Sequence, residues 1–308
     1  MRRFAFSLPG IHCLFEVTRE APQAREQDIW SEFRRHNIVF DGPYDSWRSA
    51  AAASDGYDAP VILAKVLEAT RAVVEGRAAY ERDTVIFTEK SYSHPLLAWL
   101  LYVASRSDLR LRVVDIGGAL GSSYFQNRTA LAHLADVKWC VVEQPHFVSA
   151  GRTEFEDDRL SFSDSLEEAI DRVKPDLVLL SGVLQYLEYP LEFLESLLSG
   201  GVKFILIDRT AAQFDVAAKP FVQRVPAWIY SASYPIWFLN GNELHDSFAR
   251  HGYEVLDRFQ PVGTFGSVTP PPLQELKRWG IGVSPAPQQH EWPYIGWFLE
   301  KPEIQRCA

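Results

Sequence analysis

Short apolar runs that end in a small or acidic residue dominate the chain after about residue 110. Continuous runs of this length are typical of parallel strands that are buried on both faces of a sheet. Five such runs are present, at residues 111–116, 137–142, 160–162, 177–180 and 202–207. Helical patterns separate them, so the sequence predicts an α/β fold with a doubly wound, mostly parallel sheet.

Two more strands are predicted near the end of the chain, at residues 253–259 and 294–299. The stretch between them, near 260–293, is too rich in proline for a central element and is typical of a surface excursion. Because no long helix separates these two strands, we expect them to pair antiparallel at the sheet edge. The complete sheet is then seven-stranded and Rossmann-like.

The first hundred residues have a different pattern. Apolar positions from Leu63 to Val74 recur at helical spacing and end before Gly76, and a second helix is predicted from Pro95 to Val103. We therefore expect an N-terminal helical and loop lobe over 1–108. The Rossmann-like domain follows over 109–308, with an aromatic insertion near 211–240.

Composition and charge limit the classes of partner. The 308 residues are 47% hydrophobic, and 31 basic against 40 acidic residues give a net charge of −9. An acidic chain disfavours nucleic acid and anionic membrane surfaces. Three widely spaced cysteines are not a disulfide framework, and neither a leader peptide nor a membrane-spanning stretch is predicted. These features favour a cytoplasmic protein that acts on a small molecule, and its oligomeric state is left open.

A glycine-rich turn follows the first strand of the sheet, in the segment from Asp115 through Gly117, Gly118 and Gly121. Glycine lets a ligand approach the backbone closely, and the next helix offers free amides at its N-terminus. A tight turn without a ligand is the alternative.

Carboxylates close the second and third strands. Glu143 is placed to accept hydrogen bonds from a ribose diol, and Asp164 from the amine of a base. The alternative for Glu143 is dipole compensation at a helix that begins at Pro145. For Asp164, the alternative is a capping box with Glu167.

These residues resemble class I S-adenosylmethionine-dependent methyltransferases over about residues 110 to 300. The phrases at 115–118, 123–127, 141–144, 184–187 and 207–210, with 56–58 and 80–83, are similar to a little-characterised bacterial subfamily that is often suspected of acting on glycans. One departure is Ala119, where the family has the middle glycine of its turn. The resemblance implies S-adenosyl-L-methionine as cofactor, with contacts from Asp115, Gly117, Gly118, Ala119, Ser122, Glu143, Asp164, Ser181 and Gln185.

The expected reaction is O-methylation of a small polar molecule or glycan. Asp208 after the fifth strand, or His94, is the candidate base, and Arg209 is placed to bind an anionic group of the acceptor. The alternative for the Asp208 and Arg209 pair is a salt bridge between neighbouring loops. No metal is expected, because Ser181 stands where Mg²⁺-dependent relatives carry a carboxylate.

The segment 228–238 is dense in aromatic residues. Tyr230, Tyr234 and Trp237 are candidates to stack on the acceptor, and core packing explains them equally well. Two other functions remain open. An NAD-dependent oxidoreductase also needs a glycine turn and a ribose carboxylate, although no Gly-x-Gly-x-x-Gly is present. The second open function is that of a non-catalytic S-adenosylmethionine-binding or scaffold protein.

Overall fold

The computed structural model describes residues 2–8, 11–17, 38–56, 60–261 and 294–302. The chain forms two compact units, one of residues 1–37 with 268–290 and one of residues 38–267 with 291–308. This division does not coincide with the expected boundary at 108/109. In the first unit the described part is an antiparallel pair, β1 (Arg2–Leu8) and β2 (Ile11–Val17).

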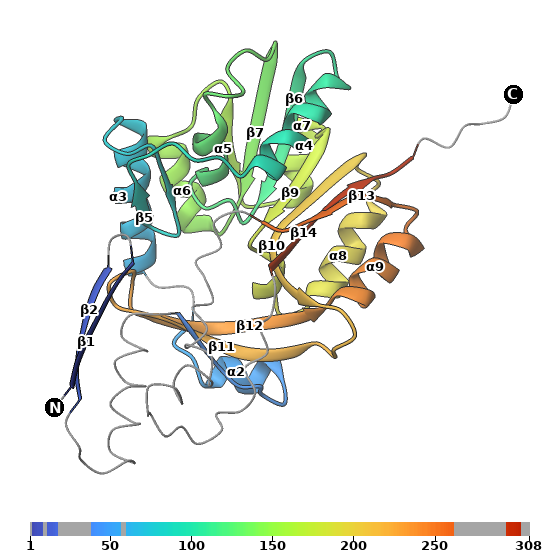
Figure 1. The fold of residues 1–308 in the computed structure, drawn as a ribbon. Coiled ribbons are helices and arrows are strands. Elements are labelled where there is room, and N and C mark those ends of the chain that lie inside the picture. Colours follow the sequence, from blue (N-terminus) through green and yellow to red (C-terminus); the bar gives the residue numbers. More distant parts are fainter. Residues whose placement is uncertain (1, 9–10, 18–37, 57–59, 262–293, 303–308) are drawn as a thin grey trace, which may run out of the picture. The chain divides into compact units, whose positions relative to one another are not determined.

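The second unit contains the predicted seven-stranded sheet (Figure 1). Its strand order is β8-β7-β6-β9-β10-β14-β13, and β14 is antiparallel to both of its neighbours. The strands are β6 (Arg110–Ile116), β7 (Asp136–Val142), β8 (Leu160–Ser163), β9 (Leu177–Ser181), β10 (Phe204–Gln213), β13 (Glu254–Phe259) and β14 (Tyr294–Glu300). The doubly wound α/β fold and the antiparallel pair at the sheet edge are confirmed.

Helices cover both faces of this sheet, which explains why its strands are continuously apolar. Along β6, Val113 and Val114 belong to two different core clusters, and so do Leu206 and Ile207 of β10, because successive side chains point to opposite faces. On the face of Val113 lie α3 (Pro60–Val74), α4 (His94–Ser105), α5 (Ser122–Asn127) and α6 (Pro145–Glu154). On the other lie α7 (Leu166–Val173), α8 (Pro190–Ser199) and α9 (Gly241–Arg250).

The fifth strand of the sheet is longer than its sequence pattern indicates. The pairing of β10 with β14 shifts register between Ile207 and Thr210, and Arg209 has a left-handed φ of 51°. Beyond this bulge, Ala212 and Gln213 pair with the end of β12 (Ala232–Asn240) instead. The bulge therefore bends β10 out of the main sheet.

The expected aromatic insertion is a small second sheet. Its strands are β3 (Val39–Asp41), β11 (Lys219–Val225) and β12, with α2 (Trp47–Ala52) in contact with β11 and β12. The expectation of helices and loops over 1–108 is thus wrong for β1, β2 and β3, and for the hairpin of β4 (Tyr80–Arg82) and β5 (Val85–Phe87). Strands of three residues are too short to show alternation in the sequence.

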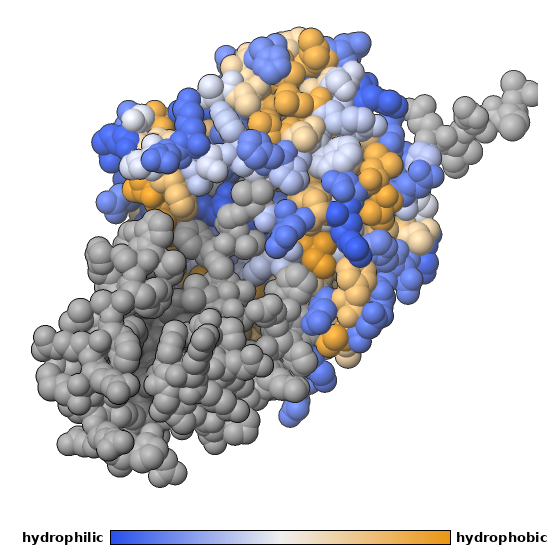
Figure 2. Space-filling model, viewed as in Figure 1, coloured by the Kyte–Doolittle hydropathy of each residue, from blue (hydrophilic) through white to orange (hydrophobic). Residues whose placement is uncertain are grey.

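The described surface is mixed in polarity, with apolar residues in separate groups among polar ones in the view of Figure 2. Large exposed apolar side chains belong to different parts of the chain, at Val61, Leu109, Tyr189 and Trp228. Within the described ranges, no helix has both the length and the apolar character to cross a bilayer.

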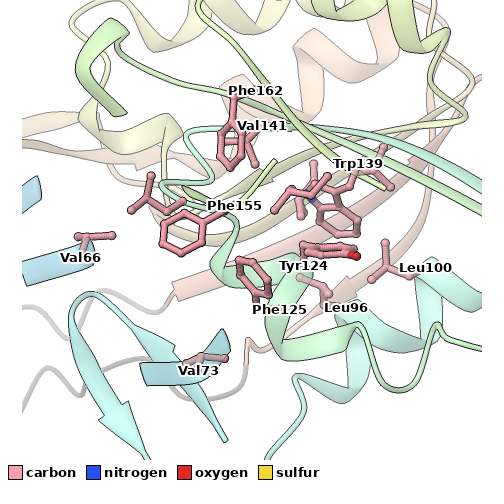
Figure 3. Packing of buried hydrophobic residues seen from close by; sticks show 14 of the residues in the cluster. Val66, Val73, Leu96, Leu100, Tyr124, Phe125, Trp139, Val141, Phe155 and Phe162 are labelled. Carbon is pink, nitrogen blue, oxygen red and sulfur yellow. The ribbon is translucent and has the colours of Figure 1, made fainter. Parts of the chain in front are cut away.

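Aromatic rings fill the core on the α4 face. Figure 3 shows Tyr124 beside Trp139, with Leu96 and Leu100 of α4 nearby. Farther along this face, Phe298 of β14 is fully buried, and its ring stacks on Trp99 at 4.0 Å and on Phe204 at 5.6 Å. One residue of the reversed strand therefore joins α4 to the centre of the sheet.

Replacing Phe298 by alanine should destabilise the fold, because the cavity lies between α4, β10 and β14. We expect a loss of about 3–5 kcal/mol in the free energy of unfolding, measured by chemical denaturation. Leu256→Ala is the matched control, since Leu256 on β13 is 39% exposed. Equal losses in the two variants would contradict this account of the core.

Candidate functional site

The glycine turn lies at the carboxyl end of β6, where side chains are excluded on two sides. A Cβ on Gly117, whose φ is +69°, would lie 2.5 Å from Cγ2 of Val183 in the loop after β9. A Cβ on Gly118 would lie 2.5 Å from Oδ2 of Asp115. The two glycines are therefore required by the protein's own packing, whatever ligand the turn binds.

Ala119 stands where the resemblance predicts a glycine. It has a left-handed φ of 51°, a conformation that costs an alanine about 1–2 kcal/mol relative to glycine. Gly121 follows with φ 94° and is the N-cap of α5. The turn therefore keeps a glycine-like backbone at Ala119 and offers the N-terminal amides of α5.

Asp115 lies beneath the turn. The side chain is 0% exposed, and its Oδ2 accepts a hydrogen bond of 3.0 Å from Nε1 of Trp139. Oδ1 has no hydrogen-bond partner within the described part of the chain. Burial is the main cause that raises the pKa of Asp115 to about 7. In this structure Asp115 supports the turn, and its direct contact with a cofactor stays a prediction.

Glu143 lies at the carboxyl end of β7, next to the turn. Its Oε2 accepts the backbone N–H of Gln144 at 2.7 Å. Burial raises the pKa of Glu143, while the amides of Gln144 and Ala119 favour its charged form. The amide of Gly117 donates to the carbonyl of Val142 at 2.9 Å, so the end of β7 that carries Glu143 lies beside the glycine turn.

Asp164, at the end of β8, is exposed. The expected capping box of Asp164 with Glu167 is wrong, because Ser165 caps α7 and accepts the N–H of Glu168 at 3.2 Å. A serine hydroxyl one position later does the capping, so Asp164 is left outside the helix cap. Its contact with a base stays a prediction.

The ends of β9 and β10 are joined by a polar network. Ser181 donates a hydrogen bond of 2.9 Å to Oδ2 of Asp208 and accepts one of 3.2 Å from Nε of Arg209. Gln185 donates to the backbone carbonyl of Arg209 at 3.1 Å. Asp208 Oδ1 and Gln185 Oε1 are buried and lack partners among the described residues. Two acceptors are thus available at the same end of the sheet as the glycine turn.

The Asp208 and Arg209 pair is not an ordinary exposed ion pair. Nε of Arg209 lies 3.7 Å from Oδ2 of Asp208, and the two side chains are 20% and 3% exposed. Burial is the main cause that raises the pKa of Asp208, against the opposing charge of Arg209. The guanidinium lies over Gly182, where a Cβ would be 3.8 Å from its Cζ. The structure thus shows a largely buried ion pair, and a role of Asp208 or Arg209 in a reaction stays a prediction.

Two site residues were missed by the functional interpretation of the sequence. Glu81 of β4 is 4% exposed, and Ser122 at the start of α5 donates a hydrogen bond to its Oε1. Burial raises the pKa of Glu81 to about 7. Beside it, Arg82 is buried, and the positive charge of Arg209 adds to burial in lowering the pKa of Arg82. The only signal for Glu81 and Arg82 in the sequence was the similarity of residues 80–83 to the bacterial subfamily, and that similarity assigned neither residue a role.

The aromatic candidates are mostly committed to the protein's own packing. Tyr234 accepts a bond from Gln223 at 3.1 Å and lies 3.1 Å from the hydroxyl of Tyr230, and both tyrosines are buried. Trp237 stacks on Trp47 at 5.7 Å. These contacts favour the core-packing alternative, and a contact of Tyr230, Tyr234 or Trp237 with an acceptor stays a prediction.

The remaining expectations concern His94 as a base and the absence of a metal site. His94 is the exposed first residue of α4, and within the described ranges no hydrogen bond or ion pair joins it to Asp208. Its role as a base stays a prediction. In the same ranges, no group of three His, Cys, Asp or Glu side chains is arranged to hold a metal ion.

Comparison with solved structures finds many similar folds at low sequence identity. An amino pentose methyltransferase from Micromonospora echinaspora has a TM-score of 0.41 at 12% identity, covering 76% of this chain and 96% of that one. Magnesium protoporphyrin IX methyltransferase from Synechocystis has 0.39 at 12%, covering 90% and 100%. The [4+2]-cyclase SpnF has 0.40 at 13%, covering 87% and 99%.

The main sheet is mostly parallel, with an antiparallel pair at one edge. No protein-family model matches the chain, and no curated protein matches it. The reaction therefore has to be argued from the site.

The raised pKa of Asp115 predicts a specific pH dependence of stability. The folded protein binds this proton more tightly than the unfolded chain, whose carboxyl has a pKa of 3.8. The stabilising contribution is complete below about pH 4 and is lost as pH rises to about 7, by at most ~1.4 kcal/mol per unit. Relative to Asp115→Asn, wild type should lose unfolding free energy over this window, measured by urea denaturation.

Asp108→Asn is the control for this experiment, because Asp108 has a side chain that is 92% exposed. Its curve against pH should run parallel to that of wild type. If the Asp115→Asn curve is also parallel to wild type, the carboxyl of Asp115 does not titrate abnormally and its assigned environment is wrong.

Proposed function

We propose that this protein is an S-adenosylmethionine-dependent methyltransferase that methylates an oxygen of a small polar molecule or a glycan. The observation that carries the proposal is the pairing of the glycine turn with Glu143. The end of β7 that carries Glu143 lies beside the turn, because the amide of Gly117 donates to the carbonyl of Val142. A carboxylate beside a glycine turn at the carboxyl ends of parallel strands suits a ribose diol.

The residues present fit this cofactor. Glu143 would hold the ribose diol, Asp164 would accept from the adenine amine, and the turn at Gly117 and Ala119 would hold the methionine part. Glu81 orients Ser122 at the first turn of α5, so the hairpin of β4 and β5 sets one wall of the same region. The buried Oε1 of Gln185 provides a further acceptor. The bound cofactor supplies an electrophilic methyl group and a sulfur that leaves with the electron pair.

Asp208 is the residue we assign to proton removal from the acceptor. Its Oδ1 is buried without a partner, while Ser181 fixes Oδ2. A carboxylate whose pKa is raised by burial is a stronger base than an exposed one and is poised closer to neutral pH. Arg209, held by Ser181, would bind an anionic or carbonyl group of the acceptor and limit the rise in that pKa.

Glu143→Gln should weaken binding of S-adenosylhomocysteine while leaving the fold intact, because the amide replaces one charge-assisted acceptor. We expect an affinity loss of about 10- to 150-fold, measured by isothermal titration calorimetry. Glu192→Gln on the exposed part of α8 is the control and should bind as wild type does.

Three outcomes of this titration would contradict the proposal. Normal affinity in a folded Glu143→Gln variant would leave Glu143 with only a structural role. Binding of NAD by wild type without binding of S-adenosylhomocysteine would favour the oxidoreductase alternative, and binding of neither would favour a scaffold protein.

Asp208→Asn should lower kcat by about 10²–10⁴-fold with little change in cofactor affinity, because the amide keeps the shape but cannot take the proton. Arg209→Gln should mainly raise the KM for an acceptor with an anionic group. Steady-state kinetics with an acceptor found by screening measures both. Near-normal kcat in Asp208→Asn would move the base role to His94 or to solvent, which His94→Ala then separates.

A further inference from the structure

A cavity of about 360 Å³ has a lining that includes no residue of the glycine turn. Its walls come from the C-terminal end of α3, the β4 and β5 hairpin, the segment after β5, and the end of α5. Basic and hydroxyl side chains make up much of the lining, namely Arg77, Lys90, Arg128, Thr88, Ser91 and Thr129. None of these residues is assigned to the cofactor or the acceptor.

The charge of this cavity is opposite to that of the whole protein. The chain carries a net charge of −9, yet three cations and no carboxylate line the cavity within the described residues. Arg77 pairs with Glu75 at 2.6 Å, but both side chains are more than half exposed, so the pair holds the guanidinium weakly. A concentration of positive charge in a concave site attracts an anion.

Lys90 and Arg128 have no carboxylate partner in the described part of the chain. The guanidinium of Arg128 lies 5.2 Å from the centre of the Phe125 ring, and its Nη2 makes a long bond of 3.4 Å to the carbonyl of Val73. Contact with a ring and one long bond leave most of its five donors available. The guanidinium of Arg128 is thus held at one wall of the cavity with most of its N–H donors available to a ligand.

The walls of the cavity are fixed before any ligand binds. Gln126 of α5 donates a hydrogen bond of 2.7 Å to the carbonyl of Ser91, which ties the segment after β5 to the helix. On the hairpin, Tyr80 stacks on Phe87 with ring centres 4.4 Å apart. A preformed site loses little conformational entropy on binding.

We propose that this cavity binds the phosphate group of a small phosphorylated molecule. A phosphate carries up to two negative charges and several acceptor oxygens, which match guanidinium, ammonium and hydroxyl donors on three sides. The volume is within the range of about 300–1,000 Å³ found for small-ligand sites. The site is distinct from the proposed cofactor site: α5 begins at Ser122 beside the turn, whereas Gln126 and Arg128 line the cavity about one turn later.

Calorimetric titration with pyrophosphate and with glucose 6-phosphate, in the absence of S-adenosylmethionine, tests this proposal. Wild type should bind both saturably, and added salt should weaken the binding. Lys90→Gln and Arg128→Gln should each reduce the affinity by about 10-fold or more, as expected for loss of one charge-assisted contact. Lys90 is exposed, so its substitution tests the site without risk to the fold.

Arg110→Gln is the matched control, because Arg110 is an exposed cation at the start of β6 that lies outside the cavity lining. It should bind pyrophosphate as wild type does. Absence of saturable binding to wild type, equal weakening by Arg110→Gln, or normal binding in both cavity variants would overturn the proposal. Binding of citrate as tight as that of pyrophosphate would overturn the preference for phosphate.

Competition separates this inference from the proposed function. S-adenosylhomocysteine should not displace pyrophosphate, and the Lys90 and Arg128 variants should bind S-adenosylhomocysteine normally. Displacement would place the anion in the cofactor site and overturn the second site. Failure of S-adenosylhomocysteine to bind at all would instead contradict the methyltransferase proposal and leave the phosphate site standing.

Discussion

The guanidinium of Arg209 is the charge on which the candidate site depends. Its positive potential opposes the rise in pKa that burial imposes on Glu81, Asp115 and Asp208, which come from three different strands. The same charge adds to burial in lowering the pKa of Arg82. Without this cation, these three buried carboxyls would have less opposing charge, and their ionised forms would be more strongly disfavoured. Arg209 thus influences the charge of groups on three strands.

The position of Arg209 follows from the bulge in β10. At a φ of 51° the residue is left-handed, and the register with β14 shifts between Ile207 and Thr210. A regular strand would continue in the main sheet and alternate its side chains between the two apolar faces. The bulge instead directs the guanidinium over Gly182 and sends the end of β10 to pair with β12. The bulge is thus the common origin of three features: the strained backbone of Arg209, the branching of β10 from the main sheet, and the burial of the guanidinium.

The sequence predicts the main sheet well because its strands are buried on both faces and must be continuously apolar. The carboxyl ends of parallel strands meet at one edge, so Glu143 and Asp208 could be placed near the glycine turn from order alone. Contacts between residues that are far apart in the sequence could not be predicted in this way. The bond from Ser122 to Glu81 joins a helix to a three-residue strand with no alternation to detect. Burial of Tyr230 and Tyr234 depends on Gln223, and no local pattern shows which hydroxyls have such a partner.

A bound ligand that donates hydrogen bonds would stabilise the candidate site. Oδ1 of Asp115, Oε1 of Gln185 and Oδ1 of Asp208 are buried acceptors without partners in the described structure. A buried polar atom left unpaired costs about 1–3 kcal/mol. They belong to β6, β10 and the turn after β9, so these three acceptors lie at one end of the sheet, whereas other unpaired buried atoms of the described structure, such as Oγ1 of Thr70 in α3 and Oδ1 of Asn127 in α5, lie elsewhere. Sugar and ribose hydroxyls are donors of the kind these oxygens lack, and this is the physical reason for the class of acceptor proposed above.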